Sequence, residues 1–161
     1  MAGALRRGAA ATLAVMIPAR ARWTGRLRTA QAAGVLLGAT AVRRLLPPRR
    51  LTLVLGQPGP ARQGVDVPLR VVGRERDVAV AVGRAAHRLP VATTCLDRAI
   101  AARLLLRAGG ARPAVVIGLA PDEEPAASTS GWGAHAWLVG DTGVVVGGAE
   151  AAAFTPVTVF R

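Results

Sequence analysis

The chain has 161 residues, of which 52% are hydrophobic and 19% are charged, so it can bury a core and is not a disordered tail. Aromatic residues make up only 3%, which argues against the stacking surfaces that bind single-stranded nucleic acid. One cysteine excludes an internal disulfide, and one cysteine with two histidines falls short of a closed structural zinc site.

The net charge of +12 is concentrated in the first half of the chain. Residues 1–60 contain ten arginines and no acidic residue, whereas residues 91–161 contain five arginines and six acidic residues. A surface of one sign attracts partners of the other sign, so the first half is suited to an acidic peptide, a protein partner or an anionic membrane surface.

Two apolar runs lie between clusters of arginine. Residues 8–19 resemble a secretory signal, but the arginines that follow oppose translocation of the segment. The second run, Thr29–Val42, has 14 residues, fewer than the roughly 20 that cross a bilayer. We predict a helix for each run, with Pro47 and Pro48 ending the second one.

A short apolar stretch, Leu51–Leu55, leads into the segment Gly56–Gly64, whose sequence GQPGPARQG is typical of a linker. Glycine and proline in such numbers disfavour regular structure. We therefore expect an Arg-rich helical region and linker over residues 1–60 and a second domain over residues 61–161.

Two helices are predicted in the second domain. Residues Asp77–Arg88 form the first, which Pro90 closes, and residues Thr94–Ala108 form the second, in which apolar residues recur at helical spacing. Gly109 and Gly110 end the second helix.

Beyond these helices the apolar residues form short runs that are typical of strands, separated by turn residues. Asp141 and Thr142 join two of these runs in a hairpin. Helices followed by antiparallel strands are an α+β arrangement. The predicted strands are Ala114–Ala120, Ala134–Gly140, Gly143–Gly148 and an edge strand at Phe154–Phe160, with a polar loop over Pro121–Gly131.

Cys95 is the candidate nucleophile, because it is predicted to start a helix. Thr94 as N-cap and Asp97 three residues later form a variant of the capping box, which places Cys95 in the first helical position. The helix dipole and the unpaired N–H groups there favour a thiolate and stabilise an oxyanion on a substrate carbonyl. The alternative is that Cys95 is a small buried residue without a chemical role.

His135 is the candidate base. It lies in a predicted strand between two alanines, and alternation puts Trp137 and Val139 on the same face. Small neighbours leave the imidazole accessible to another element, and the alternative is a partly buried histidine bonded to the backbone. His87 lies at an arginine-flanked helix end and is expected to be exposed to solvent.

A thiolate activated by a histidine, which an acid orients, is the arrangement of thiol proteases and transglutaminases. Asp141 lies six residues from His135, about 20 Å along the strand, and is expected to serve as a turn residue. A tight hairpin places residues 148–150 near the position opposite His135, and Glu150 is the acid there. We therefore predict Glu150 as the orienting group.

Several segments together resemble the protease of lasso-peptide biosynthesis, the B protein, in the form whose two functions are split between chains. The resemblance covers residues 40–160 and rests on the order of its motifs. These are Leu45–Arg50 (LLPPRR), Arg84–Pro90 (RAAHRLP) leading into Cys95-Leu96, the helix to Gly109, Val115–Leu119 (VVIGL), Ala134–Leu138 (AHAWL), the valines at 144–146 and Phe154–Pro156.

The resemblance implies a transglutaminase-like, papain-related fold, with Cys95 as nucleophile and His135 as general base. Such proteins are cysteine peptidases that remove the leader from a ribosomally made precursor before a separate ATP-dependent cyclase closes the macrolactam. No cofactor and no metal are implied. The family's aspartate falls here at Gly147 or Gly148, so Glu150 replaces it, the Cys–His pair works without a carboxylate, or activity is impaired.

The resemblance also implies partners for this chain. The segments before Cys95 do not supply the winged-helix-type module that binds the leader, so a separate small leader-recognition protein and an asparagine-synthetase-like cyclase are expected beside the precursor. We expect a cytoplasmic protein whose N-terminal region can contact a membrane surface.

Two alternatives for the function stay open. One is a transglutaminase-like acyltransferase or amidase acting on another substrate, and the other is a module that binds nucleic acid or membrane, which the near-neutral second half disfavours.

Overall fold

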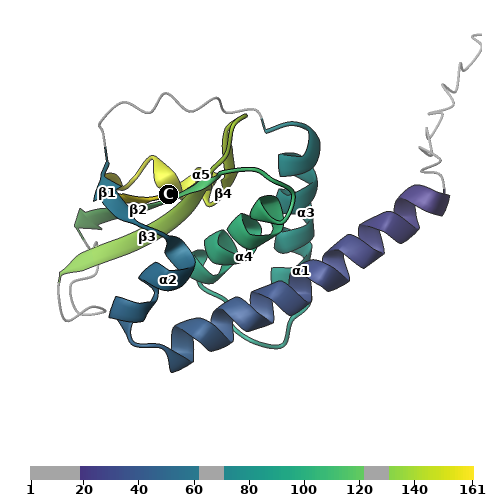
Figure 1. The fold of residues 1–161 in the computed structure, drawn as a ribbon, viewed down its shortest axis with the longest axis horizontal. Helices are drawn as coiled ribbons and strands as arrows, with labels where there is room; N and C mark the ends of the chain where they lie inside the picture. The colour runs from purple at the N-terminus through teal and green to yellow at the C-terminus, as the bar shows by residue number, and fades with distance from the viewer. Residues whose placement is uncertain (1–18, 62–70, 122–130) are drawn as a thin grey trace, which may run out of the picture.

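Three long helices lie on one face of a five-stranded antiparallel sheet in the computed structural model of the protein, which describes residues 19–61, 71–121 and 131–161 (Figure 1). This arrangement confirms the predicted α+β class. The helices are α1 (Ala19–Leu45), α3 (Gly73–Arg88) and α4 (Cys95–Arg107).

Helix α1 contains the second predicted helix, Thr29–Val42, and the arginine-flanked stretch before it. It ends at Leu45, two residues before Pro47, as predicted. One side of it packs against α3 and α4 and buries small and branched residues: Ala32, Leu36 and Ala39. The first predicted apolar run lies outside the described residues except for Ala19, where α1 begins.

The segment after α1 is more regular than its sequence indicates. A 3₁₀ turn, η1 (Pro48–Arg50), leads into the short helix α2 (Thr52–Leu55) and then the strand β1 (Pro58–Pro60). The prediction of a linker is therefore wrong for residues 58–60, because β1 pairs with the C-terminal strand. The division into two domains after residue 60 stays a prediction.

Helix α4 is central, because it contacts α1, α3 and the sheet. Its buried face carries Ala99, Ile100 and Leu106, and it also buries Arg103. The Nη1 atom of Arg103 donates hydrogen bonds to the Leu55 carbonyl and, at 3.1 Å, to the Phe160 carbonyl. Burial, assisted by the nearby charge of Arg107, lowers the pKa of the Arg103 guanidinium. This side chain ties α4 to the end of α2 and to the end of the sheet.

Four strands follow β1 in the chain: β2 (Ala114–Pro121), β3 (Trp132–Val139), β4 (Val144–Val146) and β5 (Thr155–Phe160). The sheet has the strand order β1-β5-β2-β3-β4, with every neighbouring pair antiparallel. The C-terminal strand is therefore internal, and the prediction of an edge strand is wrong, because β1 covers its outer side. The predicted loop over Pro121–Gly131 lies mainly outside the described residues.

A tight hairpin joins β3 to β4, as predicted. The Gly140 N–H donates to the Gly143 carbonyl at 2.9 Å, so Asp141 and Thr142 form the loop. Glu75 of α3 accepts hydrogen bonds from the Asp141 N–H at 2.7 Å and the Thr142 N–H at 3.0 Å. Asp141 is thus a turn residue whose backbone is held by α3.

The two faces of the sheet bury separate clusters. On the helix side, Val115, Leu138 and Val145 pack with the helical core. On the other side, Val116, Trp137 and Val159 pack together with Phe154. None of the helices in the described parts of the chain has the length and hydropathy that a membrane crossing requires.

Candidate active site

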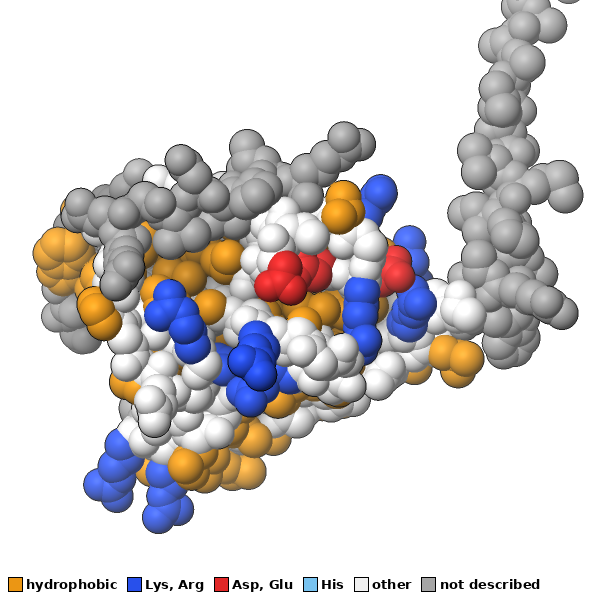
Figure 2. Space-filling view, turned by 45° about the horizontal axis from the view of Figure 1, so that its top comes forward, with side chains coloured by type: hydrophobic (Ala, Val, Ile, Leu, Met, Phe, Trp, Pro, Cys, Tyr) orange, Lys and Arg blue, Asp and Glu red, His pale blue; other side chains and the backbone are white. Residues whose placement is uncertain are grey.

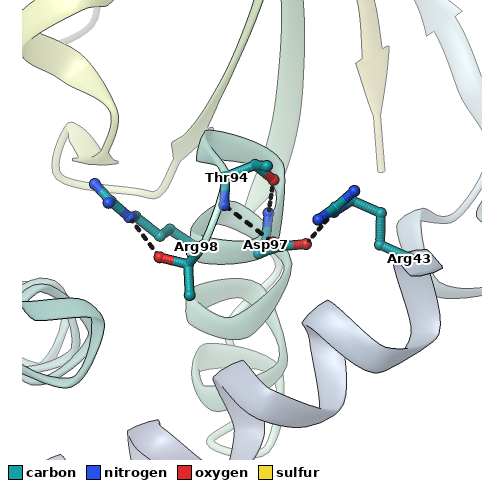
Figure 3. A network of polar contacts seen from close by, with 5 residues as sticks. Arg43, Thr94, Asp97 and Arg98 are labelled. Atoms are coloured by element: carbon teal, nitrogen blue, oxygen red, sulfur yellow. Dashed lines mark hydrogen bonds and ion pairs between the residues drawn. The ribbon is translucent and has the colours of Figure 1, made fainter. Parts of the chain in front are cut away.

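Cys95 occupies the first helical position of α4, as its sequence context predicts (Figure 3 shows the turn around it). The Thr94 hydroxyl accepts a hydrogen bond from the Asp97 N–H at 3.2 Å, and the Asp97 carboxylate accepts one from the Thr94 N–H at 3.0 Å. This capping box fixes the first turn of the helix. Cys95 itself is partly exposed.

The carboxylate of Asp97 is fully buried and is bonded to an arginine of the N-terminal helix. Arg43 Nε lies 2.6 Å from Asp97 Oδ1 (Figure 3). Burial acts to raise the pKa of Asp97, but the hydrogen bonds from Arg43 and Thr94 outweigh it and hold that pKa below its ordinary value. The hydrogen bond with Asp97 in turn raises the pKa of Arg43. The start of α4 is therefore held by an ion pair with α1.

His135 lies on β3 with its ring between two aromatic side chains. Its ring centroid is 5.8 Å from that of Trp137, which confirms that the two residues share a face, and 5.1 Å from that of Phe154. Only 11% of the side chain is exposed. The Nε2 atom lies 2.9 Å from the Gly147 carbonyl oxygen. Two rings and one hydrogen bond thus fix the imidazole.

Cys95 and His135 line the same cleft, which has a volume of about 470 Å³. The imidazole lies on the same face of the sheet as Trp137, and α4 packs on the opposite face. The cleft lies at the edge of the sheet, where side chains from both faces line it. This edge lies where β4 ends and the chain turns into the short helix α5 (Gly148–Ala151). The other lining residues are Thr93, Arg98, Val146, Gly147, Gly148, Ala149 and Glu150.

Glu150 lies in the short helix α5 (Gly148–Ala151), where the sequence places an acid near His135. Its Oε2 atom is 3.9 Å from His135 Nε2, which is beyond hydrogen-bond distance but within reach of an ion pair with a protonated ring. The side chain is 64% exposed. Its role as orienting group stays a prediction. His87 is exposed at the end of α3, as expected.

Three contributions to the site were not predicted from the sequence. The Gly147 carbonyl is a backbone group, so residue type did not reveal it. Arg98 could have been predicted from its spacing, because it lies three residues after Cys95 and therefore on the same face of α4. Its Nε donates a hydrogen bond to Thr93 Oγ1 at 3.3 Å (Figure 3). Arg43 lies 54 residues from Asp97, and no local pattern joins them.

Comparison with known proteins adds one finding to this geometry. A search of curated proteins and a search of solved structures each found no significant match. The profile of the transglutaminase-like superfamily matches residues 11–159, which is most of the chain. With a cysteine at the start of a central helix and a histidine on the antiparallel sheet, the predicted fold is confirmed, and the chain belongs to the transglutaminase-like superfamily.

Proposed function

We propose that this protein is a cysteine peptidase that removes the leader from a ribosomally synthesised lasso-peptide precursor. The observation that carries the proposal is that Cys95, at the start of α4, and His135, on β3, line one cleft. The superfamily match supports a cysteine-dependent enzyme. The order of sequence motifs supports the choice of substrate.

The chemistry begins with the transfer of the Cys95 thiol proton to His135. The Cys95 sulfur attacks the scissile carbonyl carbon, and backbone N–H groups at the start of α4 stabilise the oxyanion. His135 then protonates the leaving amine, which frees the amino end of the core peptide. Water, activated by His135, attacks the resulting thioester and releases the leader as a carboxylate, which regenerates the thiol.

We also propose that a separate leader-recognition protein binds along the exposed face of α1. Large apolar side chains are exposed along this helix at Leu27 (65%), Leu37 (43%) and Leu45 (82%). Because residues 1–60 contain no acid, like charges disfavour a second copy of this helix, whereas a partner with acidic residues around an apolar surface is complementary. Figure 2 shows arginine side chains beside apolar ones on one face of the molecule, with a few acidic side chains among them.

A matched pair of variants tests this interface. Leu37→Glu removes an apolar contact and adds a negative charge, and it is expected to weaken binding of the leader-recognition protein at least about tenfold. Gln31→Glu adds the same charge on the side of α1 nearer α3, where Gln31 lies in a hollow with Arg74 and Asp77, and is expected to keep binding. Equal binding by both variants would contradict the proposed surface.

The function itself is tested by reconstitution. The purified chain, a precursor peptide and the leader-recognition protein are mixed, and leader release is followed by mass spectrometry. Cys95→Ala and His135→Ala are expected to abolish release, whereas His87→Ala, at the exposed histidine, retains it. Cleavage that persists in Cys95→Ala would end the proposal. Macrolactam formation is expected only when the asparagine-synthetase-like cyclase is added after the leader has been removed.

The superfamily also contains acyltransferases, which share the thioester chemistry, so leader dependence separates the two functions. A leader peptidase loses turnover when the leader is deleted from the substrate. A transglutaminase-like acyltransferase or amidase that acts on another substrate shows a rate that is independent of the leader. The second result would reassign the enzyme while leaving Cys95 and His135 in place.

A further inference from the structure

The hydrogen bond of His135 identifies the state of its ring. Nε2 lies 2.9 Å from the carbonyl oxygen of Gly147. A carbonyl oxygen can only accept, so Nε2 is the donor and carries a proton in the neutral ring as well as in the charged one. A neutral imidazole has one N–H, which leaves the lone pair on Nδ1. Nδ1 is therefore the nitrogen able to act as a base.

At position 147 the backbone carbonyl, and not a side chain, contacts the imidazole. Gly147 has φ +79°, in the left-handed region that favours glycine. A Cβ there would lie 2.9 Å from the Ala136 carbonyl oxygen, 3.0 Å from Trp137 Cβ and 3.1 Å from His135 Nε2. A larger residue is thus disfavoured by both conformation and contact, and the carbonyl reaches the ring directly.

We propose that the Gly147 carbonyl is the positioning group for His135 and holds the ring as the Nε2–H tautomer, with Glu150 in a secondary electrostatic role. Glu150 Oε2 is 3.9 Å from the same nitrogen and its side chain is 64% exposed, so it adds screened attraction for a protonated ring but does not set the ring's orientation. The stacked Trp137 and the nearby Phe154 ring restrict rotation of the imidazole further.

This inference refines the proposed function and assigns its proton transfers. The Cys95 thiol proton passes to Nδ1, and the Nε2–H remains bonded to Gly147 throughout. The Nδ1 proton is then given to the leaving amine, which returns the ring to its starting tautomer. No carboxylate takes part in these proton transfers. The group that holds the histidine from behind is the neutral carbonyl of Gly147.

The tautomer is measurable without any substrate. We expect nuclear magnetic resonance of isotope-labelled histidine nitrogens, at a pH high enough to leave both rings neutral, to show His135 wholly as the Nε2–H form with a slowly exchanging proton. The exposed His87 is the internal reference and is expected to show the averaged signals of two exchanging tautomers. An Nδ1–H form at His135, or averaging that matches His87, would overturn the inference.

Neighbouring variants separate the carbonyl from the carboxylate. Gly147→Ala is expected to shift the carbonyl, lose the slowly exchanging proton and lower kcat roughly tenfold or more with little change in KM. Gly148→Ala places a Cβ 3.1 Å from Val144 Cγ1, a tight contact that does not involve the imidazole, and Glu150→Gln changes only the carboxylate. Both variants are expected to keep the Nε2–H signal. Loss of the signal in Glu150→Gln would overturn the inference even if Gly147→Ala fails to fold.

The outcomes of these experiments distinguish the two proposals. A locked Nε2–H tautomer in a protein that cleaves no precursor would leave the positioning role of Gly147 in place and remove the proposed substrate. Leader cleavage by a protein whose His135 samples both tautomers would keep the peptidase and remove the positioning role.

Discussion

Arg43 and Asp97 are 54 residues apart in the chain, and they meet at the first turn of the helix that begins with Cys95. Asp97 has no exposed surface, whereas the Arg43 side chain is 27% exposed. Because the same carboxylate also closes the capping box, the Arg-rich helix α1 and the start of α4 share one polar network. The N-terminal half of the chain therefore supports the candidate active site as well as offering a basic surface.

Removal of Arg43 is expected to destabilise the fold. Arg43→Met leaves a buried carboxylate without its cation, which costs about 3 kcal/mol of unfolding free energy, the low end for buried pairs because Arg43 keeps some contact with water. The neighbouring Arg44 is exposed, so Arg44→Met is expected to change stability by less than about 0.5 kcal/mol. Urea titrations of the two variants make the comparison. Equal losses would show that the ion pair contributes nothing specific.

The contribution of this ion pair is expected to disappear in acid. The pKa of Asp97 is lower in the folded protein than in the unfolded chain, where an aspartate titrates near about 3.9. The resulting stability is present above the unfolded pKa and is lost as the pH falls through the folded pKa. The difference in unfolding free energy between wild type and Arg43→Met should therefore be largest near neutral pH and shrink below about pH 4. A difference that stays constant to pH 3 would contradict the assignment.

The positions of Cys95 and His135 were predictable because both depend on local patterns. A Thr-x-x-Asp capping box sets the start of a helix, and strict alternation sets which face of a strand a residue occupies. Glu150 was placed near the histidine by counting residues across a two-residue turn, and that turn is present. In each case a few neighbouring residues determine the geometry.

The features that escaped prediction depend on distant parts of the chain. β1 contains two prolines among its three residues, a composition that does not indicate a strand, and only pairing with β5 makes it one. The Glu75 bonds to the hairpin and the Arg43–Asp97 pair join residues more than 50 positions apart. The Gly147 carbonyl is a backbone acceptor, so no side-chain pattern in the sequence indicates that it meets His135.

A methyl group at Gly118 is expected to disturb the aromatic side chains around His135. Gly118 pairs with His135 across β2 and β3, and a Cβ there would lie 2.8 Å from two atoms of the Trp137 ring and 3.0 Å from Phe154 Cβ. Gly118→Ala should therefore cost about 1–3 kcal/mol of stability through overpacking and lower activity as well.

Gly133→Ala is the matched control for this change. A Cβ at Gly133 would meet Phe154 at 3.7 Å, an ordinary contact, so stability and activity should be retained. Thermal unfolding and leader cleavage, measured on both variants, decide the point. A Gly118→Ala enzyme as stable and active as Gly133→Ala would mean that Trp137 and Phe154 can shift without moving the imidazole.

Glu150→Gln distinguishes an orienting acid from a weak electrostatic contribution. Loss of a true orienting carboxylate from a catalytic triad lowers kcat by roughly ten thousandfold. An exposed ion pair contributes about 0.2–1 kcal/mol, which is a loss of fivefold at most, and salt screens it. Since Glu150 lies 3.9 Å from Nε2 and is largely exposed, the smaller loss is expected, and the wild-type and Glu150→Gln enzymes should become equal in rate in high salt.

Asp141→Asn, which neutralises an acid in the hairpin turn, controls for the change in net charge. A thousandfold loss in Glu150→Gln alone would restore the carboxylate as the third member of the site, and the Gly147 carbonyl would then be only a neighbour of the ring.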